Sequence, residues 1–424
     1  KNVVLTALWY KYLNSLSVAC VAGMGTLTED TRQVRKVAGT AKTATIKKFP
    51  SVRQYTEYIC EPLTVEDLVV QPAVFISPPK WHLGHTTWFF EEFILSKHYP
   101  NYKYFHPLYS FFFGTRSESP GSSGTRSAQG NYSRPTVEEV FQYRAYVDEH
   151  MNWLLQDFPE AGLATLEAGI HHEQRHQELL YADIKYILGH NPLFPPYKKE
   201  VRETPHLEKE HNFIFIPEGK HPIGHRRKGY QTGIDCEPHG IFLRSYRIRN
   251  SLVTNHEYLQ FILDGGYQHA EYWLSDGWEW VNENGIVSPL YWHVRDGGWC
   301  RYALSGLERI NPEEPVTHVS FYEAAAFAEW KGMRLPTEFE WETAADKLPW
   351  GLRWEHTHSA FLPQRPGADP GIALSEYNGK LMINTMVIRG ASPVTPEYHS
   401  RKTSRNFAYP ASRCHFNGIR LCEK

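Results

Sequence analysis

Two histidines four residues apart, His172 and His176, are the strongest candidates for chemistry in this sequence. They lie in a segment that reads as one continuous helix over residues 166–188, so both imidazoles fall on one face, one turn apart. Imidazoles in that arrangement can bind the same metal ion. The intervening residues complete the pattern His-Glu-x-x-His, in which the glutamate of a zinc protease acts as general base. The motif is therefore consistent with three interpretations: a metal site, a zinc hydrolase, or a pair of hydrogen-bonded core histidines.

A second pair of histidines, His82 and His85, opens another predicted helix in the run WHLGH at residues 81–85. Ligands from two facing helices are the usual way in which helical bundles build metal sites. Three imidazoles that leave coordination positions open suit iron, zinc, copper or nickel equally well. The residue types alone thus favour a metal centre without selecting the metal.

The elements that must position these histidines are helices. Apolar residues recur at helical spacing in three long segments, at residues 81–95, 136–155 and 163–188. We therefore predict a helical bundle over residues 49–191, preceded by an N-terminal extension at residues 1–48. A stretch rich in proline and charge at residues 192–211 is typical of a linker.

Beyond the linker the sequence pattern changes to short runs of β-forming residues, such as residues 213–216 and 241–243. Turns rich in Gly, Pro and Asp separate these runs. Polar capping residues followed by apolar spacing predict only two short helices, near Thr254 and Phe321. Residues 212–424 are thus expected to form a second, mixed domain. The predicted fold class is α+β.

The overall composition excludes several classes of function. The 45 basic and 47 acidic side chains nearly cancel, which argues against nucleic-acid binding and favours small-molecule substrates. The six cysteines form no CxxC pair, which fits a reducing, cytoplasmic location. The N-terminal stretch lacks the unbroken apolar core of an export signal, and no apolar run reaches the roughly 20 residues that cross a bilayer.

Several longer motifs occur in one order along the chain. In the first half they are SPPKWHLGHTTWFFE at 77–91, SRPTVEEV at 133–140, AGIHHEQ at 168–174 and GHNP at 189–192. In the second half they are PVTHVS at 315–320, RLPTEFEWE at 334–342, VIRG at 387–390 and GIRL at 418–421. Together they resemble the ergothioneine-biosynthesis sulfoxide synthases, of the hercynine oxygenase type. The resemblance implies a DinB-like bundle joined to a C-type-lectin-like, formylglycine-generating-enzyme-like domain, with the active site between them.

The resemblance also implies a reaction and a ligand set. The family uses Fe(II) and dioxygen to join the sulfur of cysteine, or of γ-glutamylcysteine, to the imidazole of hercynine as a sulfoxide. Carried over by position, His82, His172 and His176 would bind the iron, and His85 would lie outside the ligand set. Formylglycine generation is not expected, because relatives with that activity bind copper through two cysteines and residues 391–405 contain none.

This sequence departs from the family at three places around the expected pocket. A tyrosine pair found in many members is replaced by Arg116 and Ser117, a glutamine by Arg175, and a Trp-Gln pair by Cys414 and His415. Arg116, Arg175 and His415 are therefore candidate substrate-binding residues. Tyr377 becomes the candidate proton donor, because a phenol can deliver a proton during catalysis. A selenoneine-type or ovothiol-type synthase and a non-catalytic metal-binding scaffold are the remaining alternatives.

Overall fold

The computed structural model describes residues 29–114, 126–199, 212–225, 235, 237–362 and 383–424. The chain divides into two compact units, residues 1–44 and residues 45–424. The described part of the first unit, residues 29–44, is helical. The second unit contains all the other elements. Within the described residues, no helix combines the length and the hydropathy needed to cross a lipid bilayer.

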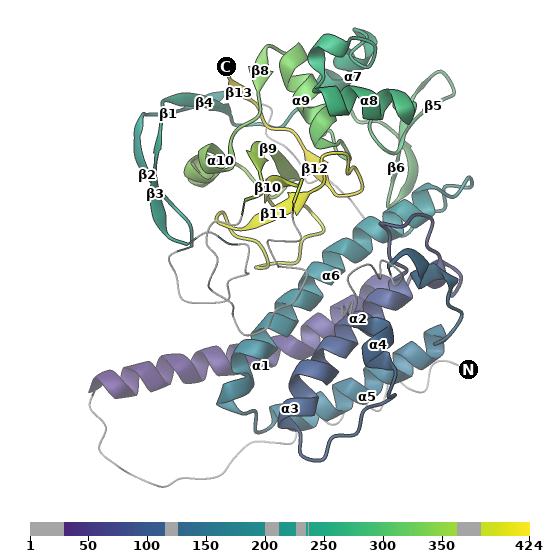
Figure 1. Ribbon diagram of the computed structural model, residues 1–424, viewed down its shortest axis with the longest axis vertical. Helices are drawn as coiled ribbons and strands as arrows, with labels where there is room; N and C mark the ends of the chain where they lie inside the picture. The colour runs from purple at the N-terminus through teal and green to yellow at the C-terminus, as the bar shows by residue number, and fades with distance from the viewer. Residues whose placement is uncertain (1–28, 115–125, 200–211, 226–234, 236, 363–382) are drawn as a thin grey trace. The chain divides into compact units, whose positions relative to one another are not determined.

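Four long helices dominate the first half of the chain (Figure 1). They are α1 (Glu29–Cys60), α2 (Pro79–Phe90), α5 (Val137–Leu155) and α6 (Leu163–Gly189). Shorter helical elements connect them: η1 (Asp67–Val69), η2 (Glu91–Leu95), α3 (Ser96–His98), α4 (Tyr109–Phe113), η3 (Arg126–Asn131) and η4 (Glu160–Gly162). Helix α2 packs against both α5 and α6, so the predicted helical bundle is confirmed.

The ends and contacts of these helices follow from their sequences. Helix α5 begins with a capping box, in which Thr136 and Glu139 each bind the other's backbone N–H. Helix α2 begins at Pro79, whose fixed φ suits the first helical turn. Gly169 lets α6 approach α2 closely, because a Cβ there would lie 2.6 Å from the Phe89 ring. The two helices that carry the histidines are therefore held in direct contact.

The described residues of the second half form four small sheets. One has the strand order β1 (Phe213–Ile216), β4 (Tyr246–Arg249), β13 (Cys422–Glu423) and β8 (Met333–Arg334). Another has the order β11 (Arg405–Ala408), β10 (Met386–Gly390), β9 (Trp354–Ala360) and β12 (Asn417–Gly418), in which only β12 runs parallel to its neighbour. The others pair β2 (Gly219–Ile223) with β3 (His239–Leu243), and β5 (Trp292–Arg295) with β6 (Gly298–Ala303) and β7 (Gly306–Arg309).

Short helices accompany these sheets. They are α7 (Asn255–Leu263), η5 (Ala270–Tyr272), α8 (Ser275–Glu283), α9 (Phe321–Trp330), α10 (Glu338–Ala344) and η6 (Ala345–Lys347). Capping boxes at Thr254, Ser320 and Thr337 begin α7, α9 and α10. The expected helices near Thr254 and Phe321 are present, whereas α8 and α10 were not predicted. The mixed composition confirms the α+β fold class.

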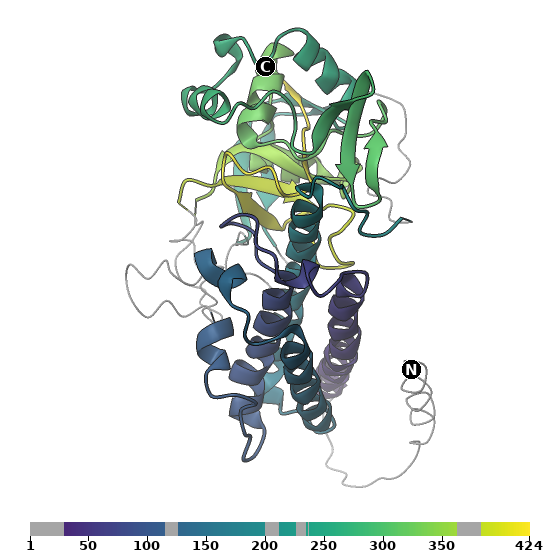
Figure 2. The same ribbon diagram turned by 90° about the vertical axis from the view of Figure 1, so that its right-hand side faces the viewer.

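Helix α6 links the bundle to the sheets, and Figure 2 shows it extending toward them. Buried Glu178 of this helix accepts hydrogen bonds from the Trp354 indole N–H, from Ser392 Oγ at 3.1 Å and from Thr395 Oγ1 at 2.9 Å. Burial raises the pKa of this carboxyl, although these donors oppose the shift. The helix that carries His172 and His176 is thus fixed to the second half through a buried polar contact. The predicted division at residues 192–211 stays a prediction.

Candidate metal centre

Three buried histidines meet between α2 and α6. One ring nitrogen of each of His85, His172 and His176 lies within 4.8 Å of the other two. The Nε2 atoms of His85 and His172 are 3.2 Å apart. Two of the three residues come from the His-x-x-x-His spacing on α6, and the third comes from the facing helix.

The orientation of His85 follows from its neighbours. Its Nδ1 lies 2.6 Å from the carbonyl oxygen of Phe113, and because a carbonyl only accepts, Nδ1 must be the donor. The lone pair of the neutral ring is then on Nε2, the atom that faces His172. Trp81 stacks on the same ring with centroids 4.4 Å apart. Gly84 allows the Phe113 segment to approach, since a Cβ there would lie 2.1 Å from the Phe113 ring.

The donor set fits a divalent transition-metal ion. Three neutral imidazoles from two rigid helices supply nitrogen ligands of intermediate softness and leave coordination positions for other molecules. Among the described residues this is the one group of histidine, cysteine or carboxylate side chains with metal-ligand spacing. The donor atoms alone do not distinguish Fe(II) from zinc, copper or nickel.

Glu173, the acidic residue of the His-Glu-x-x-His pattern, belongs to a different cluster. It pairs with Arg53 at 3.0 Å and Arg144 at 2.6 Å, and it accepts a hydrogen bond from Thr56 at 2.6 Å. Burial alone would raise its pKa, but the two guanidinium groups outweigh burial and the pKa is about 2. A carboxylate so strongly stabilised is a poor base. The arrangement therefore does not favour the hydrolase hypothesis.

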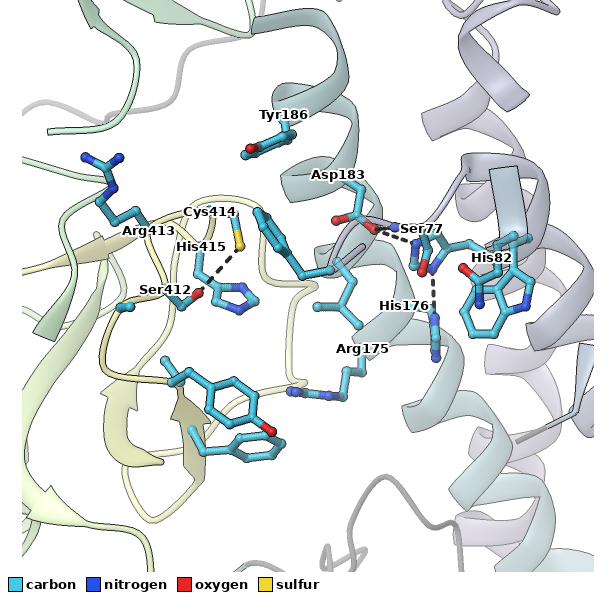
Figure 3. Close-up of a pocket in the computed structure, with 18 of the residues that line it drawn as sticks. Ser77, His82, Arg175, His176, Asp183, Tyr186, Ser412, Arg413, Cys414 and His415 are labelled. Atoms are coloured by element: carbon cyan, nitrogen blue, oxygen red, sulfur yellow. Dashed lines mark hydrogen bonds and ion pairs between the residues drawn. The ribbon is translucent and has the colours of Figure 1, made fainter. Parts of the chain in front are cut away.

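A cavity of about 1060 Å³ is lined by His82 and by His176, the one member of the three-histidine group at its wall (Figure 3). His176 and Asp183 line it from α6, and residues 407–409 and 411–415 line it from the second half of the chain. Its remaining wall is largely aromatic, with Phe75, Trp81, Phe111, Phe112, Tyr132, Tyr186 and Trp280. A small polar molecule with an apolar ring could thus lie next to His176.

Comparisons with known proteins match both halves of the chain. Residues 49–181 match the DinB superfamily, and residues 198–357 match the Sulfatase-modifying factor enzyme 1-like domain. The hercynine oxygenase of Mycolicibacterium smegmatis is 30% identical over 49% of this chain and 60% of its own length. The hercynine oxygenase of Mycolicibacterium thermoresistibile is 29% identical over 59% of this chain and 67% of its own length. The hercynine oxygenase of Mycobacterium tuberculosis is 32% identical over 43% of this chain and 53% of its own length. The match thus spans about half to two thirds of each of these relatives.

These findings support the resemblance to the ergothioneine sulfoxide synthase family. The two matched domains occur in the order that the family resemblance predicted. The site, in turn, has a buried three-histidine group that could hold a metal ion.

Two of the four residues predicted to bind substrate or donate a proton lie at the cavity. The Arg175 guanidinium donates to Asn406 Oδ1 at 3.1 Å and lies over the Phe407 ring. His415 also lines the cavity, where burial and then the charge of Arg175 lower its pKa to about 4. Arg116 and Tyr377, the other two, lie outside the described residues.

His172 and His176 are brought together as the sequence predicted, but His82 is not in the group that the geometry assembles. Its Nε2 lies 2.8 Å from Asp183 Oδ2, and its Nδ1 lies 2.8 Å from His176 Nδ1. Both ring nitrogens of His82 are thus engaged in hydrogen bonds. His82 as a ligand stays a prediction, and the geometry favours His85 in its place.

Sequence reasoning missed Asp183 and gave His85 too small a role. Asp183 is seven residues after His176, two turns along the same face of α6, so helical periodicity could have pointed to it. No comparable signal separates His82 from His85, because both lie near the start of α2. Cys414 was noted only as a substitution; it lines the cavity, and burial raises the pKa of its thiol to about 11.

Proposed function

We propose that this chain catalyses Fe(II)- and O2-dependent joining of a thiol to the imidazole of hercynine, with oxidation of the sulfur to a sulfoxide. Cysteine or γ-glutamylcysteine would be the thiol. A thiol, an imidazole C–H and O2 give the sulfoxide and one water, so dioxygen accepts all four electrons and no further reductant is needed. The observation that supports this proposal best is the buried three-histidine group, whose member His176 lines the cavity.

We assign the iron to His85, His172 and His176. When bound there, the ion would supply redox chemistry with dioxygen and favour the thiolate form of the sulfur donor. The chain itself keeps the three imidazoles oriented between α2 and α6. Because all three histidines are buried, water has limited access to the reacting atoms, which favours directed reaction over loss of the oxidant.

The cavity wall suits hercynine and an amino-acid thiol. Arg175 offers a guanidinium to a substrate carboxylate, while Trp280, Tyr186 and Tyr409 contribute aromatic rings to the wall. Aromatic faces attract quaternary ammonium groups, such as the trimethylammonium of hercynine. His415, whose lowered pKa keeps it neutral at pH 7, can donate or accept a hydrogen bond with either substrate.

Four earlier predictions belong to this proposal. Arg116 is assigned to substrate binding and Tyr377 to proton donation, so Tyr377→Phe should lower sulfoxide yield while metal binding stays intact. A cytoplasmic location is proposed because Cys60, Cys300, Cys414 and Cys422 are all free thiols. We propose small-molecule partners only, without nucleic acid.

A substrate panel tests the reaction. Purified protein loaded with Fe(II) is mixed with hercynine or histidine, and with cysteine, γ-glutamylcysteine or a selenosugar, with and without O2. Mass spectrometry should detect an O2-dependent hercynine sulfoxide with wild type and with His150→Ala, which removes an imidazole elsewhere in the bundle, but not with His85→Ala.

The other outcomes are equally specific. Conversion of histidine would indicate an ovothiol-type synthase, and use of the selenosugar would indicate a selenoneine-type synthase. Metal binding without any conversion would contradict the proposal and leave a metal-binding scaffold. Peptide cleavage in place of these reactions would restore the zinc hydrolase hypothesis.

A further inference from the structure

His82 and Asp183 form a buried pair at the edge of the three-histidine group (Figure 3). Only 2% of His82 and 7% of Asp183 is exposed. Asp183 Oδ2 also accepts a hydrogen bond from the Ser77 backbone N–H at 3.1 Å. The carboxylate is thus held from α6 and from the segment that precedes α2, where it contacts His82.

The hydrogen-bond pattern determines which nitrogen of each ring carries a proton. An ionised carboxylate only accepts, so His82 Nε2 must donate to Asp183. A neutral His82 then has its lone pair on Nδ1. That atom lies 2.8 Å from His176 Nδ1, and it can only accept. His176 must therefore carry its proton on Nδ1 and its lone pair on Nε2.

We infer that Asp183 and His82 position His176 as a metal ligand by fixing its tautomer and its ring orientation. A metal-binding histidine usually donates its second ring N–H to an oriented acceptor, which keeps the coordinating nitrogen aimed at the ion. The Phe113 carbonyl has this role for His85, and His82 has it for His176. This inference rests on the proposed metal site and assigns His82 a positioning role instead of a ligand role.

Cobalt(II) provides a direct probe, because its binding can be followed by its visible absorption without any substrate. Metal-free wild type, His82→Ala, Asp183→Ala, Asp183→Asn and the double variant His82→Ala/Asp183→Ala are each titrated with Co(II). His85→Ala and His172→Ala serve as ligand-loss references, and His150→Ala as the matched histidine control.

The inference predicts a graded result. Affinity should fall about 10- to 100-fold in His82→Ala and in Asp183→Ala, as is usual when the partner of a metal ligand is removed. His85→Ala and His172→Ala should lose stoichiometric binding, while His150→Ala stays at the wild-type affinity. Asp183→Asn retains an oxygen acceptor and should recover most of the affinity that Asp183→Ala loses.

The double variant separates positioning from general destabilisation. If Asp183 acts only through His82, removing both should weaken Co(II) binding no more than His82→Ala alone, whereas independent structural defects would add. Additive losses, or unchanged affinity in both single variants, would overturn the inference. Loss of binding in His82→Ala with retention in His85→Ala would also overturn it and make His82 the ligand. Absence of binding by wild type would instead overturn the proposed metal site.

Discussion

Two of the buried polar clusters on helix α6 differ in their balance of charge. Around Glu173, one carboxylate is paired with two guanidinium groups and a hydroxyl. Around His172 and His176, neutral imidazoles meet a third imidazole, and no carboxylate takes part in the group. Asp148 also pairs with Arg53, and Glu57 pairs with Arg144, so the guanidinium charges of the first cluster are met within it. The second cluster places several lone pairs close together and is suited to a cation.

The comparison shows why adjacent residues of one motif have unrelated roles. His172 and Glu173 are neighbours in sequence, but consecutive side chains on an α-helix point in directions about 100° apart. The histidine therefore faces α2 at the level of His85, while the glutamate faces the arginines of α1 and α5. The pattern His-Glu-x-x-His specifies spacing, and the packing partners specify chemistry.

Loss of the Glu173 carboxylate should have the largest effect on the free energy of unfolding. Glu173→Ala leaves the buried guanidinium groups of Arg53 and Arg144 without their shared carboxylate, which costs about 3–5 kcal/mol in buried pairs. Urea denaturation should show this loss, whereas Glu149→Ala, an exposed change on α5, should stay within about 0.5 kcal/mol. If Glu173→Ala kept wild-type stability but lost peptide cleavage, Glu173 would have a catalytic role and not the stabilising role that we assign to it.

Acid should weaken the same cluster. The pKa of Glu173 is lowered from 4.5 to about 2 in the folded chain, so its contribution is complete above pH 4.5 and is lost as the pH falls toward 2. The difference corresponds to about 3 kcal/mol. Unfolding free energies measured from pH 6 to pH 2.5 should fall more steeply for wild type than for Glu173→Gln. Parallel curves would show that Glu173 is not stabilised as described.

Removing the Thr56 hydroxyl should sharpen the contrast between stability and metal binding. Thr56→Val keeps the side-chain shape but deletes the donor to Glu173 and the acceptor of the Gln177 amide. A hydrogen bond to a charged group contributes about 1.5–3 kcal/mol. We expect that loss in urea denaturation together with unchanged Co(II) affinity. A large fall in affinity without a fall in stability would mean that the two clusters are coupled.

The smallest effect concerns the cavity beside the histidines. Arg175→Ala should raise the KM for the carboxylate-bearing substrate about tenfold, equivalent to about 1.4 kcal/mol, with a smaller change in kcat. Arg175→Lys keeps the charge and should give an intermediate KM in the same steady-state assay. Equal KM values for all three proteins would remove Arg175 from substrate binding.

Much of the architecture could be predicted because local rules determine it. Capping residues such as Thr254 and Ser320 mark helix starts in the sequence, and the structure has capping boxes there. The helical face that presents His172 and His176 likewise follows from a spacing of four. These features depend only on residues that are close together along the chain.

The third histidine could not be chosen in the same way. His82 and His85 are three residues apart on α2, and both reach toward α6. Their roles depend on distant partners, since Asp183 and His176 engage His82 while the Phe113 carbonyl and His172 engage His85. The role of Glu173 likewise depends on Arg53 and Arg144, far away in sequence. Such pairings are fixed by tertiary packing.

An anaerobic titration of metal-free protein with Fe(II) tests the central claim most directly. The three-histidine group predicts one tightly bound Fe(II) per wild-type chain and none per chain of His85→Ala, with Glu173→Gln still binding one. The opposite pattern, with full binding in His85→Ala and loss in Glu173→Gln, would show that the metal belongs to the other cluster and would contradict the account.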